Sequence, residues 1–248
     1  MTENRFTDRT IVVTGAGSGI GHATAVRLAE EGARVIGVDI SRQRLRALEG
    51  ELGTRVATVD GDLAEQLTVD RVLAAAGPRI AGLANIAGIM DGFEPSAEIN
   101  DQTWDRVLAV NVTAMMRLTR AVLPAMIEAG AGSIVNVSSE AGQRGSAAGT
   151  TYTVSKHAVN GFTISTAFFY TPKGIRCNAV APGPVATNIE APFRSPLAQE
   201  RLGPIMQATI PAVAQPAALA AAITWLLSDD ASDVSGAILP VDGGWTAI

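Results

Sequence analysis

The feature that most constrains the fold is a regular alternation between short runs of β-branched residues and longer segments with helical spacing. Runs such as Thr10–Thr14 and Arg34–Asp39 are nearly continuous and apolar, which predicts strands buried on both faces. Segments such as Arg42–Leu52 place apolar residues three and four apart, which predicts helices. With right-handed crossovers, this alternation predicts a doubly wound α/β fold, a parallel sheet with helices on both faces.

The alternation continues along the chain without a Pro/Gly/Ser-rich linker, so we expect a single domain over residues 1–248. The predicted strands are Thr10–Thr14, Arg34–Asp39, Arg55–Asp60, Leu83–Ala87, Ser133–Val137, Ile175–Ala181 and Ala237–Val241. The predicted helices are Ile20–Glu31, Arg42–Leu52, Glu65–Ala76, Thr103–Ala129, Tyr152–Tyr170 and Gln215–Leu227.

One segment, residues 188–214, interrupts the alternation with four prolines among large apolar residues. A long irregular insertion in a compact domain is usually functional. We expect a mobile substrate lid with one or two short helices, lying over the carboxyl ends of the strands. The apolar residues of the lid and of residues 90–93 favour a small apolar substrate: Met90, Phe93, Phe193, Leu197, Leu202 and Met206.

Composition excludes several classes of protein. The 19 Lys and Arg residues are outnumbered by 24 Asp and Glu, and no basic run suits a nucleic-acid-binding face. One Cys and two His exclude a disulfide framework, a Cys-based zinc site and a three-His site, so we expect no metal. Met1–Arg9 lacks the apolar core of a secretory signal, and Pro216–Leu227 is shorter than the ~20 residues that span a bilayer. We therefore expect a cytoplasmic protein with no membrane or nucleic-acid partner.

Four glycines follow the first predicted strand, in Thr14-Gly-Ala-Gly-Ser-Gly-Ile-Gly21. Glycine permits a tight turn and lets backbone N–H groups approach a pyrophosphate at a helix N-terminus. Gly15, Gly19 and Gly21 fit G-x-x-x-G-x-G, whereas Ile20 breaks the spacing G-x-G-x-x-G. A purely structural turn, or the loop of a methyltransferase that binds S-adenosylmethionine, would have a similar composition. The strand context favours a dinucleotide site in a Rossmann fold.

Two acidic residues follow neighbouring strands. Asp39 ends the second strand, eighteen residues after Gly21, where an acidic side chain binds the adenosine ribose hydroxyls and repels a 2′-phosphate. This position favours NAD over NADP, although a simple strand-end or N-cap Asp would have the same spacing. Asp62, after the third strand, could contact the adenine or only stabilise a turn.

Tyr152 and Lys156 are four residues apart on a predicted helix and therefore share one face. A free Tyr has a pKa near ~10 and is a poor base at pH 7, but a nearby ammonium stabilises the phenolate. Lowering the pKa of Tyr152 by two or three units requires ~3–4 kcal/mol, which a desolvated Lys and the positive nicotinamide of an oxidised cofactor could supply. Taken alone, the Tyr-x-x-x-Lys pattern is weak.

Two further polar positions are candidates for the same site. Ser138 and Ser139 follow the strand Ser133–Val137, where the carboxyl ends of parallel strands open onto the ligand crevice. A Ser there can donate to a carbonyl oxygen, or can cap a helix. Asn111 lies on the apolar stripe of the long predicted helix and needs partners if it is buried. It could hold a water or a neighbouring Lys, or bond to the backbone.

These motifs, in this order and spacing, resemble the short-chain dehydrogenase/reductase family over essentially the whole chain. Thr14–Gly21 resembles its cofactor loop, Asn85-Ile-Ala-Gly88 its strand-four motif, and Pro182-Gly-Pro-Val-Ala-Thr187 its Pro-Gly motif. The end of the chain, Gly236–Gly244, resembles its C-terminal strand and tail. The catalytic tetrad of the family falls on Asn111, Ser139, Tyr152 and Lys156.

The resemblance implies a role for each member of the tetrad and a homotetrameric assembly. Tyr152 is the expected general acid/base on the substrate oxygen, which Ser139 orients and polarises. Lys156 is expected to bind the ribose and lower the pKa of Tyr152, and Asn111 to support a water relay to Lys156. Hydride transfer belongs to the nicotinamide cofactor. The implied cofactor contacts are Gly15, Ser18, Gly19, Ile20, Gly21, Asp39, Asp62, Leu63, Asn85, Ala87, Gly88, Tyr152, Lys156, Pro182, Gly183, Val185 and Thr187.

Three positions depart from the family pattern. Ile86 replaces the second Asn of the strand-four motif, and Cys177 stands in a strand where Val is usual. We interpret Cys177 as a buried small hydrophobe rather than a nucleophile. Ala167–Tyr170 is bulkier than usual and could reshape an interface or the pocket.

The leading hypothesis is an NAD-dependent oxidoreductase that interconverts a secondary alcohol and a ketone. An activity like that of 3-oxoacyl-(acyl carrier protein) reductases is the alternative, and Asp39 argues against it because such reductases usually favour NADP. A noncatalytic nucleotide sensor on the same fold is a more remote alternative, against which the intact tetrad argues.

Overall fold

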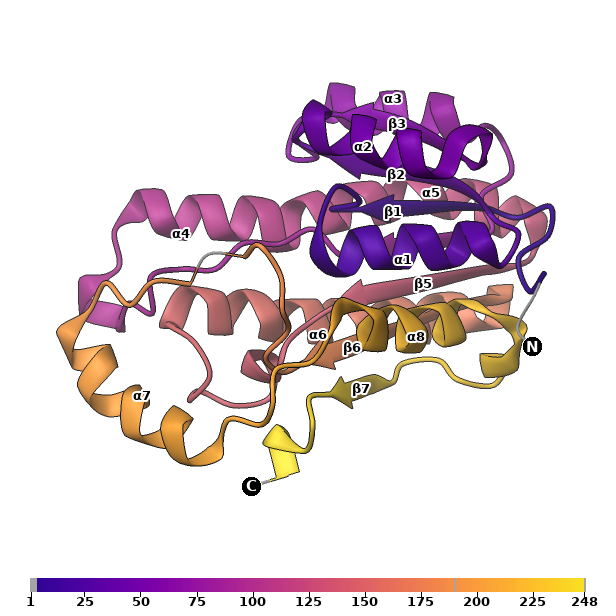
Figure 1. The fold of residues 1–248 in the computed structure, drawn as a ribbon. Helices are drawn as coiled ribbons and strands as arrows, with labels where there is room; N and C mark the ends of the chain where they lie inside the picture. Colours follow the sequence, from indigo (N-terminus) through magenta and orange to yellow (C-terminus); the bar gives the residue numbers. More distant parts are fainter. Residues whose placement is uncertain (1–3, 190, 248) are drawn as a thin grey trace.

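The computed structural model describes residues 4–189 and 191–247. Residues 1–3 of the N-terminal stretch and residue 190 of the expected lid lie outside the described residues, as does residue 248. Seven parallel strands form one sheet in the order β3-β2-β1-β4-β5-β6-β7 (Figure 1). The strands are β1 (Thr10–Thr14), β2 (Arg34–Asp39), β3 (Val56–Asp60), β4 (Gly82–Asn85), β5 (Gly132–Val137), β6 (Ile175–Pro182) and β7 (Ile238–Val241). The predicted doubly wound Rossmann fold is confirmed, with its switch point between β1 and β4.

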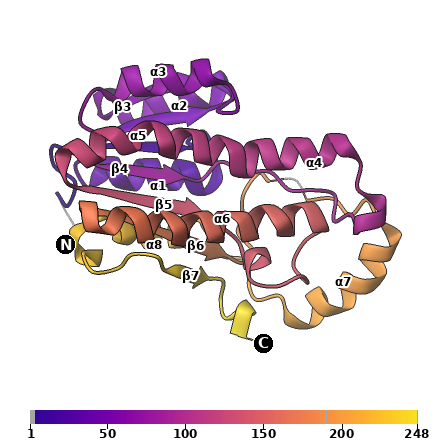
Figure 2. The same cartoon turned by 180° about the vertical axis from the view of Figure 1, so that it is seen from behind.

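Helices cover both faces of the sheet (Figures 1 and 2). One layer contains α1 (Gly19–Glu30), α2 (Arg42–Leu52) and α8 (Pro216–Leu227). The other contains α3 (Gln66–Ala76), α5 (Met115–Ala129) and α6 (Thr150–Tyr170). The five inner strands are buried on both sides, as their continuous apolar runs predict, whereas the edge strands β3 and β7 are partly exposed.

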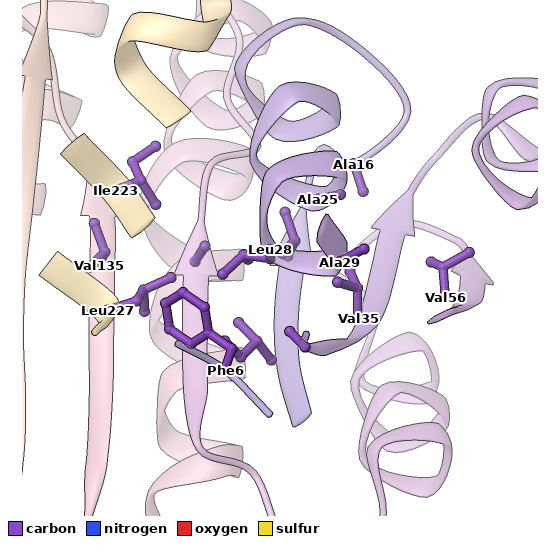
Figure 3. Packing of buried hydrophobic residues seen from close by; sticks show 14 of the residues in the cluster. Phe6, Ala16, Ala25, Leu28, Ala29, Val35, Val56, Val135, Ile223 and Leu227 are labelled. Atoms are coloured by element: carbon purple, nitrogen blue, oxygen red, sulfur yellow. The ribbon is translucent and has the colours of Figure 1, made fainter. Parts of the chain in front are cut away.

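Each layer has its own core because successive strand side chains point to opposite faces. Ile11 and Val13 of β1 belong to the core that also contains Leu28, whereas Val12 packs in the opposite core with Leu118. Figure 3 shows the first core, in which residues of α1 and α8 pack around Phe6 and the strand residue Val135. This two-sided packing holds the carboxyl ends of the strands at fixed positions.

The predicted bounds of β1, β2 and α2 match the structure, but the fourth strand ends two residues earlier than predicted. After Asn85, the chain leaves the sheet. The amides of Ile86 and Ala87 donate to Thr14 Oγ1 at 2.8 and 3.0 Å instead of joining a ladder. A side chain of β1 therefore anchors the turn that opens the site.

The long helix predicted over Thr103–Ala129 is not one regular helix. The structure has α4 (Asp101–Leu108), a π-helix (Ala109–Ala114) and α5. The helix begins earlier because Asn100 caps it, accepting the Thr103 amide at 2.8 Å. By length and composition alone, this 29-residue segment could cross a membrane. Its α5 part lies along the sheet in Figure 2 and buries Leu118 and Met126 in the second core, as a core helix does.

The described residues of the lid region contain one helix, α7 (Pro196–Thr209), which at 14 residues is longer than the one or two short helices predicted. Ser195 caps it by accepting the Ala198 amide at 3.1 Å, and Pro196 occupies the first turn, where no amide donor is needed. Pro204 is accommodated inside the helix. In Figure 1, α7 lies beyond the carboxyl ends of the strands, where the lid was predicted.

Candidate active site

A cavity of about 530 Å³ lies at the carboxyl ends of β1, β2 and β4. Its volume is in the usual range of small-molecule sites, ~300–1,000 Å³. Of the predicted cofactor residues, those lining it are Gly15, Ser18, Gly19, Ile20, Gly21, Asp39, Asp62, Leu63, Ala87, Gly88 and Thr187. Those outside its lining are Asn85, Tyr152, Lys156, Pro182, Gly183 and Val185.

The glycine loop is a close-packed main-chain cradle. A Cβ atom on Gly21 would lie 2.1 Å from the carbonyl oxygen of Gly15, and one on Gly19 would lie 2.9 Å from Thr187 Cγ2. Gly19 also has φ +53°, which favours glycine. The side chain of Ser18, the N-cap of α1, makes no capping hydrogen bond, and the first turn holds no acidic residue. The amides at this helix N-terminus therefore suit the pyrophosphate of a dinucleotide.

Asp39 is nearly buried at the end of β2 and already accepts three hydrogen bonds. Oδ2 accepts the Gly17 amide at 3.0 Å, and Oδ1 accepts the Ser41 amide and Arg44 Nη2, both at 2.8 Å. A carboxylate has about four acceptor positions, so one remains for a ribose hydroxyl. Arg44 also lines the cavity, and sequence reasoning missed it. The sequence did offer one signal: Arg44 comes three residues after Ser41, in the first turn of the helix that follows Asp39.

Asp62 stabilises a turn, one of the two roles predicted for it. Oδ1 accepts the Ala64 amide at 2.9 Å, and Oδ2 lies 3.4 Å from Arg106 Nη1. Both Asp62 and Arg106 line the cavity. The adjacent Leu63 is buried and forms part of the cavity wall.

Asn85 ties strands and helices together rather than lining the main cavity. Its Nδ2 donates to Asn136 Oδ1 at 2.8 Å and to Thr119 Oγ1 at 3.1 Å, while Oδ1 has no partner among the described residues. Asn85 and Asn111 both line a second cavity of about 10 Å³, the size of a single water. The Ile86 side chain packs against the first core, so this departure from the family pattern leaves the backbone of the turn in place.

Tyr152 and Lys156 lie together on α6, with Lys156 Nζ 5.3 Å from the centre of the Tyr152 ring. Lys156 Nζ donates to the carbonyl oxygen of Val137, at the end of β5, at 2.9 Å. Ser139 lies near the Tyr152 phenol, whose pKa it lowers, and its Oγ accepts the Ala141 amide at 3.1 Å. The capping role predicted for Ser139 is confirmed, whereas its donation to a substrate oxygen stays a prediction. Ser138 is buried and instead contacts the Lys156 carbonyl at 3.3 Å.

Asn111 lies in the π-helix and is held by the backbone of Ile89. Its Oδ1 accepts the Ile89 amide at 2.8 Å, and its Nδ2 donates to the Ile89 carbonyl at 2.9 Å and to Ser155 Oγ at 3.1 Å. A Cβ on Gly88 would lie 3.3 Å from Asn111 Oδ1 and 3.5 Å from Lys156 Nζ, so both residues flank Gly88. Single π-turns are frequent at functional sites.

Burial dominates the electrostatics of the pair. It raises the pKa of Tyr152 to about 12, against the lowering effect of the Ser139 hydrogen bond, while the Asp91 carboxylate raises it further. Burial also lowers the pKa of Lys156 to about 8. Burial therefore opposes the lowering of the Tyr152 pKa that the sequence predicts from Lys156 and an oxidised cofactor. The cause is an apolar enclosure made by Met90, Phe93, Ala141, Ala147, Ala148, Ala198, Leu202, Met206 and Trp245.

The Pro-Gly segment closes one side of the site. A Cβ on Gly183 would lie 2.9 Å from the Asp242 carbonyl oxygen, which explains the glycine after β6. Val185 bridges to Ala214, and the Ala186 amide donates to the Ala214 carbonyl at 2.9 Å. These contacts pin the two ends of the lid region together. Thr187 reaches the cavity beside Gly19.

The lid docks on the loop that follows β4. The Phe193 ring stacks on Phe93 with 4.2 Å between ring centres, and the Arg194 amide donates to the Gly92 carbonyl at 3.0 Å. Phe93 has φ +58°, in the left-handed region that costs a bulky residue roughly 1–2 kcal/mol. The stack and a hydrogen bond from the Phe93 amide to Asp91 Oδ1 at 3.0 Å hold it there.

The remaining departures lie away from the site. Cys177 is buried in β6, and burial raises the pKa of its thiol to about 12, as fits a small hydrophobe. Phe168 and Phe169 are exposed on α6, so the bulk of this stretch lies on the surface. Within residues 4–189 and 191–247, no three His, Cys, Asp or Glu side chains are grouped to hold a metal ion.

A glycine-cradled cavity at the switch point, with an acidic residue at the end of β2, defines a Rossmann-type dinucleotide-binding protein. Comparisons with known proteins give the family. Residues 9–198 match the family model described as short chain dehydrogenase. The chain belongs to the short-chain dehydrogenase/reductase family and is an oxidoreductase acting on CH–OH groups.

Three similar proteins illustrate the range of the family. Short-chain dehydrogenase/reductase cdmF of Talaromyces verruculosus is 41% identical, over 97% of this chain and 98% of that protein. The structure of levodione reductase superposes with a TM-score of 0.88 at 33% identity, covering 98% of this chain and 99% of that one. A single-substitution variant of actinorhodin polyketide ketoreductase with NADPH superposes with a TM-score of 0.85 at 32% identity, covering 97% of this chain and 98% of that one.

Proposed function

We propose that the chain interconverts a secondary alcohol and a ketone with NAD as the hydride carrier, with residues 188–214 as a substrate lid on a single domain. The observation that carries this proposal is the convergence of Tyr152, Lys156 and Ser139 beside the dinucleotide cavity. When bound, the nicotinamide supplies or accepts the hydride.

Tyr152 moves the proton at the substrate oxygen. In carbonyl reduction, its hydroxyl donates to the oxygen that becomes the alcohol, and in oxidation its phenolate takes the alcohol proton. Ser139 donates to the same oxygen and orients it. The pKa of about 12 for Tyr152 keeps the phenol protonated at neutral pH, as reduction requires. A cationic nicotinamide and the nearby Lys156 act in the opposite direction during oxidation.

Lys156 and Asn111 support that proton transfer. Lys156 uses one of its three donors on Val137, which leaves two for the nicotinamide ribose. Asn111 Oδ1 keeps one acceptor position near Lys156 Nζ. The cavity of about 10 Å³ is lined by Asn85, Asn111 and Val137, the carbonyl partner of Lys156, and has room for a single relay water.

The preference for NAD over NADP rests on Asp39. Its carboxylate has one acceptor position free for a ribose hydroxyl and would repel a 2′-phosphate. Arg44 pairs with Asp39 and is a possible partner for a 2′-phosphate. The preference for NAD over NADP therefore depends on whether the adenosine ribose contacts Asp39 or Arg44. The remaining predicted contacts, including Gly183, Val185 and Thr187, border the nicotinamide end.

The enclosure of Tyr152 supports a small apolar substrate. Its walls are apolar side chains from the β4–α4 loop, the lid and the C-terminal segment, represented by Phe93, Leu202 and Trp245. An apolar wall excludes water from the reacting atoms. A polar or charged substrate would lose its hydration there without gaining matching partners.

We also propose a cytoplasmic homotetramer. Helix α6 exposes apolar residues on its outer face: Val154, Ile164, Phe168 and Phe169. Such a patch is typical of an interface, and the paired helix of a second copy would cover it. Light scattering on the purified protein would show the tetramer mass, and a monomer would contradict this part of the proposal.

The test is turnover of a panel of secondary alcohols and ketones with NAD(H) and NADP(H), followed at the nicotinamide absorbance. The wild type should turn over apolar members, with a preference for NAD(H). Tyr152→Phe should lose about 10²- to 10⁴-fold. Tyr170→Phe, at the other end of α6, is the matched control and should stay near wild type. Unchanged turnover by Tyr152→Phe would contradict the assignment of Tyr152 as the general acid/base. A clear preference for NADP would contradict the role of Asp39 in cofactor selection.

A 3-oxoacyl-(acyl carrier protein) reductase-like activity is the second candidate, favoured by the similarity to a polyketide ketoreductase solved with NADPH. The panel separates the two candidates when it includes a 3-oxoacyl thioester. Preferred reduction of that thioester with NADPH would favour the second candidate. Binding of NADH without turnover of any panel member would favour a nucleotide sensor.

A further inference from the structure

Helix α6, which carries Tyr152 and Lys156, begins without a cap of its own. Its N-cap residue is Gly149, which has no side chain to accept the amides of the first turn. Such amides need partners when they are buried. The partners come instead from the loop after β4, about 60 residues earlier in the chain.

Asp91 is the main partner. Its Oδ2 accepts the amide of Tyr152 itself at 2.9 Å, and its Oδ1 accepts the amides of Gly149 at 3.3 Å and Phe93 at 3.0 Å. Beside it, the Glu94 carbonyl accepts the Thr150 amide at 3.0 Å. One loop thus satisfies three amides at the start of the helix.

The close contact between loop and helix depends on Gly149. A Cβ on Gly149 would lie 2.5 Å from both Asp91 Oδ2 and the Glu94 amide nitrogen. Any side chain at this position would push Asp91 away from Tyr152. The glycine therefore serves the approach of the carboxylate, in addition to starting the helix.

Asp91 is a buried charge stabilised by dipoles. It is only 4% exposed, and in the described part of the chain no Lys, Arg or His forms an ion pair with it. Three amides and the positive end of the helix dipole stabilise its negative charge. Its carboxylate raises the pKa of Tyr152.

The segments near the enclosure of Tyr152 carry other charged groups as well. They are Lys156 on α6, Glu94 on the β4–α4 loop, Glu140 and Arg144 after β5, Arg194 on the lid and Asp242 after β7. Glu140 pairs with Arg144, and Arg194 lies 4.0 Å from Glu94. Among the residues that the structure describes, Asp91 is the one carboxylate whose charge contributes to raising the pKa of Tyr152.

We propose that Asp91 is a positioning residue for this reaction, holding Tyr152 in place through its backbone amide and keeping a negative charge close to this residue. This proposal rests on the proposed function of Tyr152 as the acid/base. Asp91 acts through Tyr152 and need not touch the substrate.

The test is the pH profile of kcat/KM for alcohol oxidation, which should rise as Tyr152 loses its proton. In Asp91→Asn, which removes the charge and keeps the size, the rising limb should move to lower pH by about one unit. Asp101→Asn is the matched control, because this exposed carboxylate begins α4 on the same connection. The rising limb of the pH profile of Asp101→Asn should coincide with that of the wild type. Asp91→Ser, a smaller neutral acceptor, serves if Asn does not fold.

A second readout does not depend on turnover. The chain has two tyrosines, so in a Tyr170→Phe background the near-ultraviolet titration of tyrosinate follows Tyr152 alone. Adding Asp91→Asn should move its midpoint to lower pH.

Three outcomes overturn the proposal: an equal loss of kcat/KM at every pH with an unmoved limb, an unmoved tyrosinate midpoint, or failure of both Asp91 variants to fold. Tyr152→Phe separates this proposal from the proposed function. If Tyr152→Phe stays active, the acid/base assignment fails. If it is inactive while the Asp91→Asn limb and midpoint stay in place, only the role of Asp91 fails.

Discussion

The cofactor cavity and the enclosure of Tyr152 share Met90, yet different parts of the protein form most of their walls. The cavity is an open volume of about 530 Å³ whose cradle is main chain, shaped by glycines such as Gly21. The enclosure is closed by apolar side chains, which leave Tyr152 8% and Lys156 3% exposed. Backbone geometry therefore determines what the first region binds, whereas burial determines the proton chemistry of the second. Substitutions should affect the two regions separately.

The largest effect is expected for Gly21→Ala in the cradle. The added methyl would lie 2.1 Å from the backbone oxygen of Gly15, which cannot move without opening the loop. We expect loss of NADH binding and destabilisation by about 3 kcal/mol, at the upper end for overpacking. Gly50→Ala is the control, because a methyl there meets nothing within 4 Å and should stabilise α2 by about 0.5–1 kcal/mol. NADH fluorescence titration and thermal unfolding measure both effects, and normal binding by Gly21→Ala would contradict the close-packed cradle.

The second effect concerns Lys156, whose burial weakens the fold. The unfolded chain keeps the Lys156 proton up to a pKa of 10.5, but the folded protein only up to a pKa of about 8. The unfolded state therefore binds more protons between these values, and stability rises with pH across that interval. Lys156→Met should stabilise the protein by about 1–3 kcal/mol at pH 7 while abolishing turnover.

The control for that variant is Lys173→Met, which changes the chain's other, exposed lysine. Denaturant unfolding at pH 7 and between pH 8 and 10 measures the difference. The advantage of Lys156→Met over the wild type should shrink as the pH rises. If Lys156→Met is less stable than the wild type at pH 7, burial does not disfavour the charged form of Lys156.

A smaller effect is expected for Asp39→Asn at the ribose end of the cavity. Removing the charge should lower the preference for NAD over NADP by about tenfold, because a 2′-phosphate is no longer repelled. Asp60→Asn is the matched control, since Asp60 is the register partner of Asp39 on β3 and pairs with Arg42 and Arg71 outside the cavity. The ratio of kcat/KM with the two cofactors measures the effect. An equal ratio for Asp39→Asn and wild type would remove Asp39 from cofactor selection.

The smallest effect is expected for Phe193→Ala in the lid. The variant loses the ring stack on Phe93, which is worth about 0.5–1.5 kcal/mol. We expect KM for an apolar ketone to rise about two- to tenfold with kcat nearly unchanged. Leu197→Ala, an exposed position on the same lid, should leave KM in place. Equal KM values for both variants would show that the stack does not close the enclosure.

The same division explains which features were predictable from the sequence. Strands such as β1 are buried on both faces, so their apolar runs are continuous and their bounds could be predicted. Glycines and Asp39 mark the cradle by local spacing, and the structure places both at the cavity. These features depend on neighbouring residues in the chain.

The features that were missed depend on distant residues. The π-turn is tied to Asn111, whose partner Ile89 lies 22 residues earlier. The pKa of Tyr152 is raised by burial among residues of the lid and the C-terminal Trp245, a contribution that the Tyr-x-x-x-Lys spacing alone does not reveal. The cap on α6 comes from Asp91, 61 residues before Tyr152. Contacts between residues so far apart in the chain cannot be predicted from a local sequence pattern.

The most direct test of the separation between the two regions is the NADH affinity of Tyr152→Phe, measured by fluorescence titration on the same preparation used for turnover. The variant keeps the cradle and removes only the phenolic hydroxyl. An NADH dissociation constant within about twofold of the wild type, together with a loss of turnover of about 10²-fold or more, is the predicted result. Retained turnover, or a parallel loss of NADH affinity, would contradict the account.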